Sequence, residues 1–299
     1  MTAKQRYLRG LGLTTLGMLV LSVDSLMVKL IAAPTLDQVA WRGIPMAFVV
    51  LLLFMPVFRT VGGMAPAFRQ LGWLGVVAAL LYSSGSIGFV GGIELTNVST
   101  LLVIVATTPM FTAIAGWLLY GATVPMHTKL AMVATFVGIA LAVNGWLAGG
   151  SWFGLAVCFI VPIGLGTFLT ILEHNPHIDN LGCLVVASFV TGAIGLGFGS
   201  PFDIDGVERG LALLHGSVIL PIAFALYTIG PKYLTGPETG LLLLLETVLG
   251  TFWVWLILGE EPALLTLVGG AIVILAVSAH ALYSLRLLDA AERAAARPA

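Results

Sequence analysis

Long apolar runs are the feature of this sequence that most limits how the chain can fold. Each run is roughly 17 to 25 residues long, the length needed to cross the hydrocarbon core of a bilayer as a helix. A spanning backbone must satisfy its own hydrogen bonds, so continuous runs of this length are expected to be helical. The sequence therefore predicts an all-α integral membrane protein with ten transmembrane helices. The ten runs are Leu11–Ala33, Val39–Phe58, Leu71–Gly92, Val98–Tyr120, Leu130–Leu147, Trp152–Leu172, Leu181–Phe198, Leu211–Ile229, Leu241–Leu258 and Leu264–Leu285.

The composition supports this class and excludes others. Hydrophobic residues make up 59% of the 299 residues and charged residues 9%, too few to cover a soluble globule. The net charge of -1 and the lack of a basic run argue against nucleic acid as a partner. The first run is too long for a cleaved signal peptide and carries Asp24 and Lys29, so we interpret it as a retained helix.

The placement of basic residues predicts the orientation. With a cytoplasmic N-terminus, nearly all Lys and Arg residues near helix ends fall on the cytoplasmic side, and Arg209 is the clear exception in an outer loop. An even number of helices then returns the C-terminus to the cytoplasm. The expected partners are the lipid bilayer and a small-molecule substrate, and the oligomeric state is left open.

The two halves of the chain resemble each other. The segments PTLDQ (residues 34–38) and PHIDN (residues 176–180) share a pattern, and each precedes the second helix of one expected half, residues 1–148 and 149–299. Five helices is an odd number, so the second half must enter the membrane from the opposite side. Asp37 and Asp179 are therefore expected on opposite sides, as in inverted repeats with a substrate site near the midplane.

Glu246 lies in the middle of the ninth run, where a charged side chain is costly unless it faces a protein interior or a wet cavity. Helical spacing places it on one face with Leu242, Gly250 and Trp253. Together with the indole, it could hold a substrate ammonium by ion pairing and a cation–π contact. The alternative is a structural contact between helices.

Asp24 and Arg42 are ionisable residues of the first two runs. Asp24 could accept a substrate amine or relay a proton, or else bond to the nearby Ser22 or Ser25. Arg42, beside Trp41, is interpreted as an interface anchor rather than a ligand for a carboxylate. No Lys or Arg is expected at the midplane.

Other residues carry weaker predictions. Tyr82 and Tyr227 could present their rings and hydroxyls to a cavity, and Pro109, Pro162 and Pro221 could kink their helices as hinges. The stripe of Ser84, Gly88 and Gly92 is interpreted as helix packing. His174 and His177 lack further clustered ligands, and the two cysteines are interpreted as packing residues, so no metal and no cofactor are predicted.

Four segments of the chain carry a resemblance to a known family. They are AWRGIPMAF (Ala40–Phe48), TTPMFTAIAGWLLYG (Thr107–Gly121), LLETVLGTFWVWLILGEEP (Leu244–Pro262) and LLTLVGGAIVILAV (Leu264–Val277). In these segments the chain resembles the drug/metabolite transporter superfamily, and within it the EamA-type ten-helix exporters. Two departures are the sequences LYGATVP, where the family often has Gly-Glu, and Glu-Thr at residues 246–247, where it often has Glu-Pro.

The resemblance implies a transporter of the bacterial cytoplasmic membrane, similar to the YddG-like exporters of amino acids, aromatic ones among them. With no phosphate-binding loop, the expected activity is secondary export of small metabolites by alternating access, driven by the substrate gradient or by protons. Efflux of drugs or quaternary cations, and transport of sugar phosphates or nucleotide sugars, are the alternatives. An enzyme is not expected, because no catalytic cluster is evident.

Overall fold

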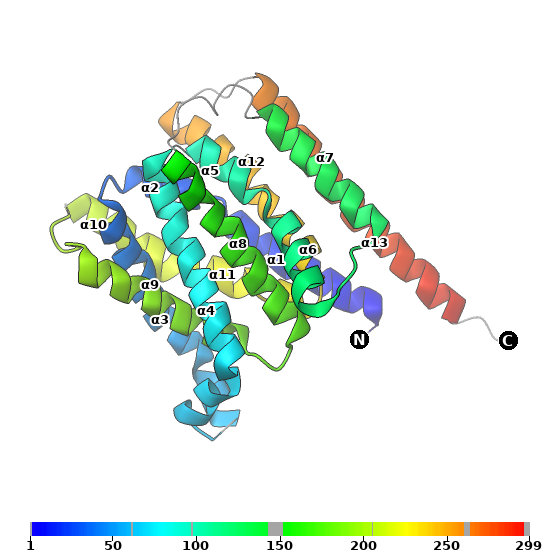
Figure 1. The fold of residues 1–299 in the computed structure, drawn as a ribbon, viewed down its shortest axis with the longest axis horizontal. Coiled ribbons are helices and arrows are strands. Elements are labelled where there is room, and N and C mark those ends of the chain that lie inside the picture. Colours follow the sequence, from blue (N-terminus) through cyan, green and yellow to red (C-terminus); the bar gives the residue numbers. More distant parts are fainter. Residues whose placement is uncertain are drawn as a thin grey trace.

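The structure is a computed structural model, and it describes residues 2–60, 62–96, 98–142, 152–204, 206–259 and 264–295. Every regular element in these ranges is helical, which confirms the all-α prediction (Figure 1). The elements are α1 (Ala3–Leu21), α2 (Asp24–Leu30), α3 (Thr35–Thr60), α4 (Met64–Leu95), α5 (Val98–Val105), α6 (Thr108–Tyr120), α7 (Met126–Ala142), α8 (Trp152–His174), α9 (Asn180–Phe198), α10 (Gly206–Leu214), the π-helical turn η1 (His215–Ile219), α11 (Leu220–Tyr227), the 3-10 turn η2 (Gly230–Lys232), α12 (Gly236–Leu258) and α13 (Leu264–Ala295).

Within the described residues, eight helical segments are long and apolar enough to cross a membrane. These segments indicate a multi-pass membrane protein. The predicted run Val98–Tyr120 forms two shorter helices, α5 and α6, and the run Leu130–Leu147 corresponds to α7, which has 17 residues up to Ala142. The eight segments are Ala3–Leu30, Thr35–Val57, Met64–Leu95, Trp152–His174, Asn180–Phe198, Gly206–Lys232, Gly236–Leu258 and Leu267–Leu288.

Several of the helical stretches are discontinuous. The first breaks between Leu21 and Asp24, where α1 ends and α2 begins. Pro109 lies in the first turn of α6, directly after the break that follows α5, and Pro221 lies in the first turn of α11, directly after η1. Pro162, in contrast, lies inside α8, which continues without a break in its assignment. Two of the three predicted kink positions thus coincide with helix boundaries.

The most extensive contacts between helices join α3 with α9, α4 with α8, α4 with α9, α6 with α8, α1 with α11, α6 with α12, and α7 with α13. The last pair runs along one edge of the bundle (Figure 1). Glycine allows the closest approach, since a Cβ on Gly43 of α3 would lie 2.1 Å from the backbone nitrogen of Gly192 in α9. The predicted stripe of small residues on α4 also packs as expected: a Cβ on Gly88 would lie 3.2 Å from the Val157 carbonyl oxygen of α8.

Two aspartates mark opposite ends of α9. Asp179 caps its N-terminus, where its carboxylate accepts hydrogen bonds from the backbone of Leu181 and Gly182. Asp37, in the first turn of α3, accepts a 2.6 Å hydrogen bond from the backbone of Ser200, just beyond the C-terminus of α9. Since α9 has 19 residues, its ends lie roughly 28 Å apart.

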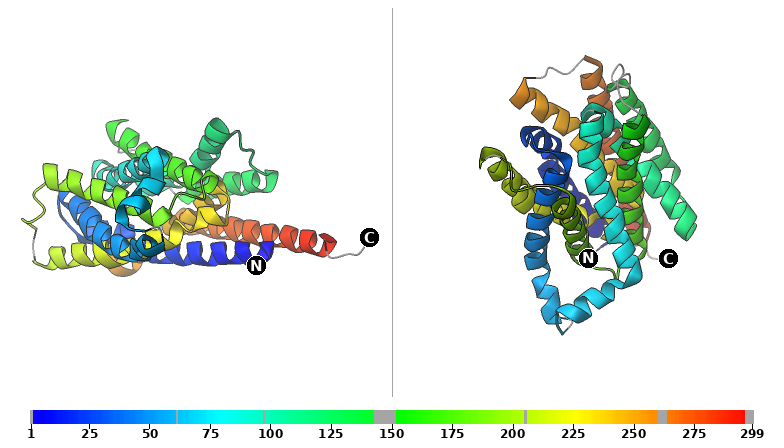
Figure 2. Two further views of the ribbon diagram at one scale, coloured as in Figure 1. Left: turned by 90° about the horizontal axis from the view of Figure 1, so that it is seen from below. Right: turned by 60° about the vertical axis from the view of Figure 1, so that its left-hand side comes forward.

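The start of α1 and the end of α13 lie toward the same end of the bundle, here called the terminus end (Figure 2).

Candidate functional site

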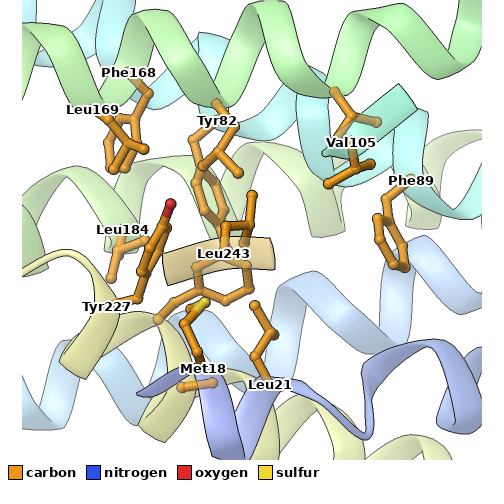
Figure 3. Packing of buried hydrophobic residues seen from close by; sticks show 14 of the residues in the cluster. Met18, Leu21, Tyr82, Phe89, Val105, Phe168, Leu169, Leu184, Tyr227 and Leu243 are labelled. Atoms are coloured by element: carbon orange, nitrogen blue, oxygen red, sulfur yellow. The ribbon is translucent and has the colours of Figure 1, made fainter. Parts of the chain in front are cut away.

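A central cavity is enclosed by residues of α1, α2, α3, α4, α5, α8, α11 and α12. The empty space along it totals about 410 Å³. Most of the surface is apolar, as Figure 3 shows for Leu21, Tyr82, Phe89, Val105 and Leu243. The charged groups on its wall are Asp24, Arg42 and Glu246.

Asp24 and Arg42 form a buried bidentate ion pair. The two terminal nitrogens of the guanidinium donate to the two carboxylate oxygens at 2.5 and 3.0 Å. On the other side, Nε2 of His215 lies 2.8 Å from Oδ1 of Asp24. All three residues are less than 5% exposed. Because charges are costly to bury unless they are paired, this arrangement lets α2, α3 and η1 carry polar groups inside the bundle.

The backbone explains how these three residues meet. The break after Leu21 places Asp24 at the first position of α2. The π-helical turn that begins at His215 comes so close to α3 that a Cβ on Gly216 would lie 2.0 Å from the carbonyl oxygen of Trp41. Glycine is therefore required beside His215. Single π-turns occur frequently at functional sites, where they reposition side chains.

Glu246 is the third charged group of the cavity and is 2% exposed. Within the described part of the chain, its Oε1 atom accepts no hydrogen bond. The predicted stripe on α12 faces the break between α1 and α2: a Cβ on Gly250 would lie 2.8 Å from Oγ of Ser25, and Nε1 of Trp253 donates to Oγ of Ser22 at 2.8 Å. Glu246 thus faces the protein interior. This position was expected, because a carboxylate is costly to expose to lipid.

The five candidate site residues separate into two groups. Asp24, Tyr82 and Glu246 line the cavity, whereas Tyr227 and Trp253 do not. Tyr227 is fully buried, and among the described residues its hydroxyl has no hydrogen-bond partner. Figure 3 shows it beside Leu184 and below Leu169, in the same packed region as Tyr82.

Aromatic rings form one wall of the site. The ring of Tyr82 contacts Phe224 edge-to-face with a centroid distance of 5.0 Å, and Phe168 at 5.4 Å. The guanidinium of Arg42 lies 5.4 Å from the centroid of Phe89, a cation–π distance. The cavity therefore combines a paired cation, an unpaired acceptor and aromatic surface.

Three sequence-based interpretations need correction. Arg42 is not an interface anchor, because it is 4% exposed and paired with Asp24. Asp24 bonds to Arg42 rather than to nearby serines, and its Oδ1 lies 2.8 Å from Nε2 of His215. The expectation that no arginine lies at the level of the site is wrong for the same reason. His215 was missed, although a lone histidine inside the apolar run LALLHGSVIL is the kind of residue that marks an interior polar site.

Metal ligation has no support in the described residues, where no three His, Cys, Asp or Glu side chains gather to hold an ion. His174 instead stacks on Tyr120 with a centroid distance of 4.1 Å, and His177 is exposed. Cys158 and Cys183 are free and buried, which confirms their packing role.

Comparison with known proteins supports the fold alone. No family model matches the sequence, and no curated protein matches it. A solved structure described only as "Crystal structure of protein" has a similar fold, with a TM-score of 0.76 and 16% sequence identity. The similarity covers 95% of this chain and 98% of that one. The arrangement of helices around the cavity is thus one that an experimentally determined protein also adopts across its length.

Proposed function

We propose that this protein is a secondary transporter of the EamA type that exports small metabolites, with amino acids, including aromatic or hydrophobic ones, as its main substrates. It works by alternating access at the central cavity. In this proposal, residues 1–148 and 149–299 form two inverted repeats of five transmembrane helices in the bacterial cytoplasmic membrane. Both termini are cytoplasmic.

The helix pairing supports the inverted repeats. If α1–α2, α3, α4, α5–α6 and α7 are the first five spans, the most extensive contacts join spans 1 with 8, 2 with 7, 3 with 6, 3 with 7, 4 with 6, 4 with 9, and 5 with 10. Exchanging the two halves converts the pair 1–8 into the pair 6–3 and maps 2–7, 4–9 and 5–10 onto themselves. The pairs 3–7 and 4–6 become 8–2 and 9–1, which are also in contact. A two-fold axis in the membrane plane would produce this pattern. The position of Asp37 and Asp179 at opposite ends of α9 is also what such an axis requires.

The unpaired carboxylate carries the substrate proposal. Arg42 and Asp24 neutralise each other, so Glu246 is the one acidic group on the cavity wall without an ion-pair partner of this kind among the described residues. An ammonium group would supply the hydrogen bond that Oε1 lacks. The aromatic wall suits an apolar side chain, and Nε of Arg42, which has no hydrogen-bond partner within the described ranges, is a donor for a carboxylate. A zwitterionic amino acid matches these three features.

Two alternatives differ in what they ask of the cavity. A quaternary cation would use Glu246 and the aromatic rings and would need no donor for a carboxylate. A sugar phosphate or nucleotide sugar would need excess positive charge, and the pairing of Arg42 with Asp24 leaves none from this arginine. The cavity therefore favours amino acids and cations over phosphorylated substrates.

Uptake into proteoliposomes tests the proposal. The panel contains labelled aromatic and aliphatic amino acids, a nucleotide sugar and a quaternary cation, each with and without a pH gradient. Glu246→Gln should lower amino-acid transport about 10-fold or more, because a hydrogen bond to a charged group contributes on the order of 1.5–3 kcal/mol. Glu94→Gln, at the exposed end of α4, is the matched control. If Glu246→Gln transports every substrate at the wild-type rate with the same pH response, the proposed role of Glu246 is wrong.

A further inference from the structure

The central cavity has walls of two chemical kinds. Its charged groups, Asp24, Arg42 and Glu246, belong to α2, α3 and α12. The wall formed by α4 and α8 carries no charged side chain among the described residues. From these two helices the cavity is lined by Tyr82, Gly85, Ser86, Phe89, Val161 and Leu165. A substrate whose ammonium group binds Glu246 would therefore have the uncharged wall available for its side chain.

One position in the middle of this wall has no side chain. Tyr82, Gly85 and Phe89 share one face of α4, because residues three, four and seven apart lie on the same side of a helix. Tyr82 and Phe89 are two helical turns apart, about 10.5 Å along the helix axis. Figure 3 shows their two rings standing apart from each other. Gly85 thus leaves the stretch of wall between the rings uncovered.

Packing between helices does not require a glycine at position 85. A Cβ on Gly85 would lie 3.5 Å from the carbonyl oxygen of Val161 and 3.7 Å from the backbone nitrogen of Leu165, which are ordinary van der Waals distances. The next glycine along α4 differs, since a Cβ on Gly88 would lie only 3.2 Å from a backbone oxygen of α8. Val161 and Leu165 also line the cavity. A side chain at position 85 would therefore be added where α4 and α8 both border the cavity.

The two rings beside Gly85 are held by other partners. Tyr82 is 5% exposed and contacts Phe224 edge-to-face at a centroid distance of 5.0 Å. Phe89 is 6% exposed, and its ring lies 5.4 Å from the guanidinium of Arg42. Because both rings are fixed in this way, they are not free to close over Gly85. The size of the space between them depends on the residue at position 85.

We propose that Gly85 is a specificity-determining residue of the central site, which sets the largest substrate side chain that the cavity accepts. This inference rests on the proposed function. The substrate side chain occupies the space over Gly85, with Tyr82 on one side and Phe89 on the other. A ring halfway between positions two helical turns apart would lie about 5 Å from each, within the range of favourable aromatic pairs. A side chain at position 85 would take the place of that ring.

Competition between a large and a small amino acid tests this inference. Phenylalanine and alanine carry the same charged groups and differ by one ring, so the ratio of their transport rates in the same proteoliposomes reports on the side-chain site alone. A change of one methylene in an apolar pocket changes selectivity by about 10- to 200-fold. Gly85→Ala should therefore lower the ratio of phenylalanine to alanine transport about 10-fold, and Gly85→Leu should lower it further.

Gly91→Ala and Gly91→Leu are matched controls on the same helix. A Cβ on Gly91 would lie 3.6 Å from Cγ1 of Val157 in α8, much like the distances at Gly85, but Gly91 is not among the described residues that line the cavity. Both control variants should keep the wild-type ratio. Because the two amino acids are measured in the same vesicles, a smaller amount of folded protein lowers both rates equally and leaves the ratio unchanged.

The outcomes separate this inference from the proposed function. The inference is overturned if Gly85→Leu keeps the wild-type ratio, or if Gly91→Leu lowers the ratio as much as Gly85→Leu does. The proposed function stands in either case, because the wild type still transports both amino acids. If the wild type transports neither amino acid, the proposed function fails and this inference fails with it.

Discussion

The ion pair between Asp24 and Arg42 gives the sharpest prediction about the energetics of the site. Asp24→Asn keeps the shape of the side chain and removes its charge, which leaves the 4% exposed guanidinium of Arg42 without a counterion. Removing one partner of a buried pair costs about 3–5 kcal/mol, because the other charge stays desolvated. We expect Asp24→Asn to lower the free energy of unfolding by about this amount.

The second charge can then be removed as well. Arg42→Met replaces the arginine by an unbranched apolar side chain, and replacing both partners of a buried pair often costs little. The double variant Asp24→Asn/Arg42→Met should therefore recover at least about 2 kcal/mol relative to the sum of the single variants, a coupling typical of residues in direct contact. Asp203→Asn, in an exposed loop, controls for the loss of one carboxylate.

The assay is reversible unfolding in mixed micelles, followed by tryptophan fluorescence, for the wild type, both single variants, the double variant and the control. If the effects of the two single substitutions on the free energy of unfolding simply add, the two charges do not stabilise each other. The proposed neutralisation of Arg42 by Asp24 in the cavity is then wrong. The same cycle separates roles in transport: if Arg42 also binds a substrate carboxylate, the double variant regains stability but not amino-acid transport.

Three further substitutions test other parts of the site. Gly216→Ala should destabilise the protein by about 1–3 kcal/mol, because the new Cβ would lie 2.0 Å from the Trp41 carbonyl oxygen. Gly210→Ala is the control and should be close to neutral, because its Cβ meets nothing within 4 Å. Equal effects of the two substitutions in thermal unfolding would contradict the tight contact at Gly216. Tyr227→Phe should leave stability unchanged or raise it, since the buried hydroxyl has no partner among the described residues, and a loss above about 1 kcal/mol in the same assay would reveal a missed hydrogen bond. Trp253→Phe should cost about 1 kcal/mol through the lost indole bond, and an unchanged unfolding free energy would show that this bond contributes nothing.

The sequence predicts the helical class well and the breaks within helices poorly. Long apolar runs report directly on membrane spans, because the bilayer demands both length and hydrophobicity. The break after Leu21 has no proline or glycine to mark it, so the run containing Asp24 reads as one continuous helix. The prolines give partial information: Pro109 and Pro221 stand at boundaries, yet Pro162 lies in an unbroken assignment.

The site was partly predictable for a related reason. Asp24 and Glu246 are conspicuous because each places a carboxylate inside an apolar run, a cost that points to an interior position. The partners of Asp24 are not conspicuous. Arg42 is 18 residues away in another helix, close enough to a helix end to pass for an interface residue, and His215 belongs to the other half of the chain. Contacts between spans depend on helix rotation and crossing, which local spacing does not contain.

The difference between the two carboxylates links structure to function. Both carboxylate oxygens of Asp24 accept hydrogen bonds from the guanidinium of Arg42, whereas Oε1 of Glu246 has no hydrogen bond among the described residues of the same cavity. Leaving a buried acceptor without a hydrogen bond costs about 1–3 kcal/mol or more. We would not expect a residue that only packs against its neighbours to carry this cost. In the proposed function, a ligand that donates to Glu246 recovers this free energy on binding. Asp24 then serves to neutralise Arg42 and shape the wall, and Glu246 is the group with which a substrate ammonium would pair.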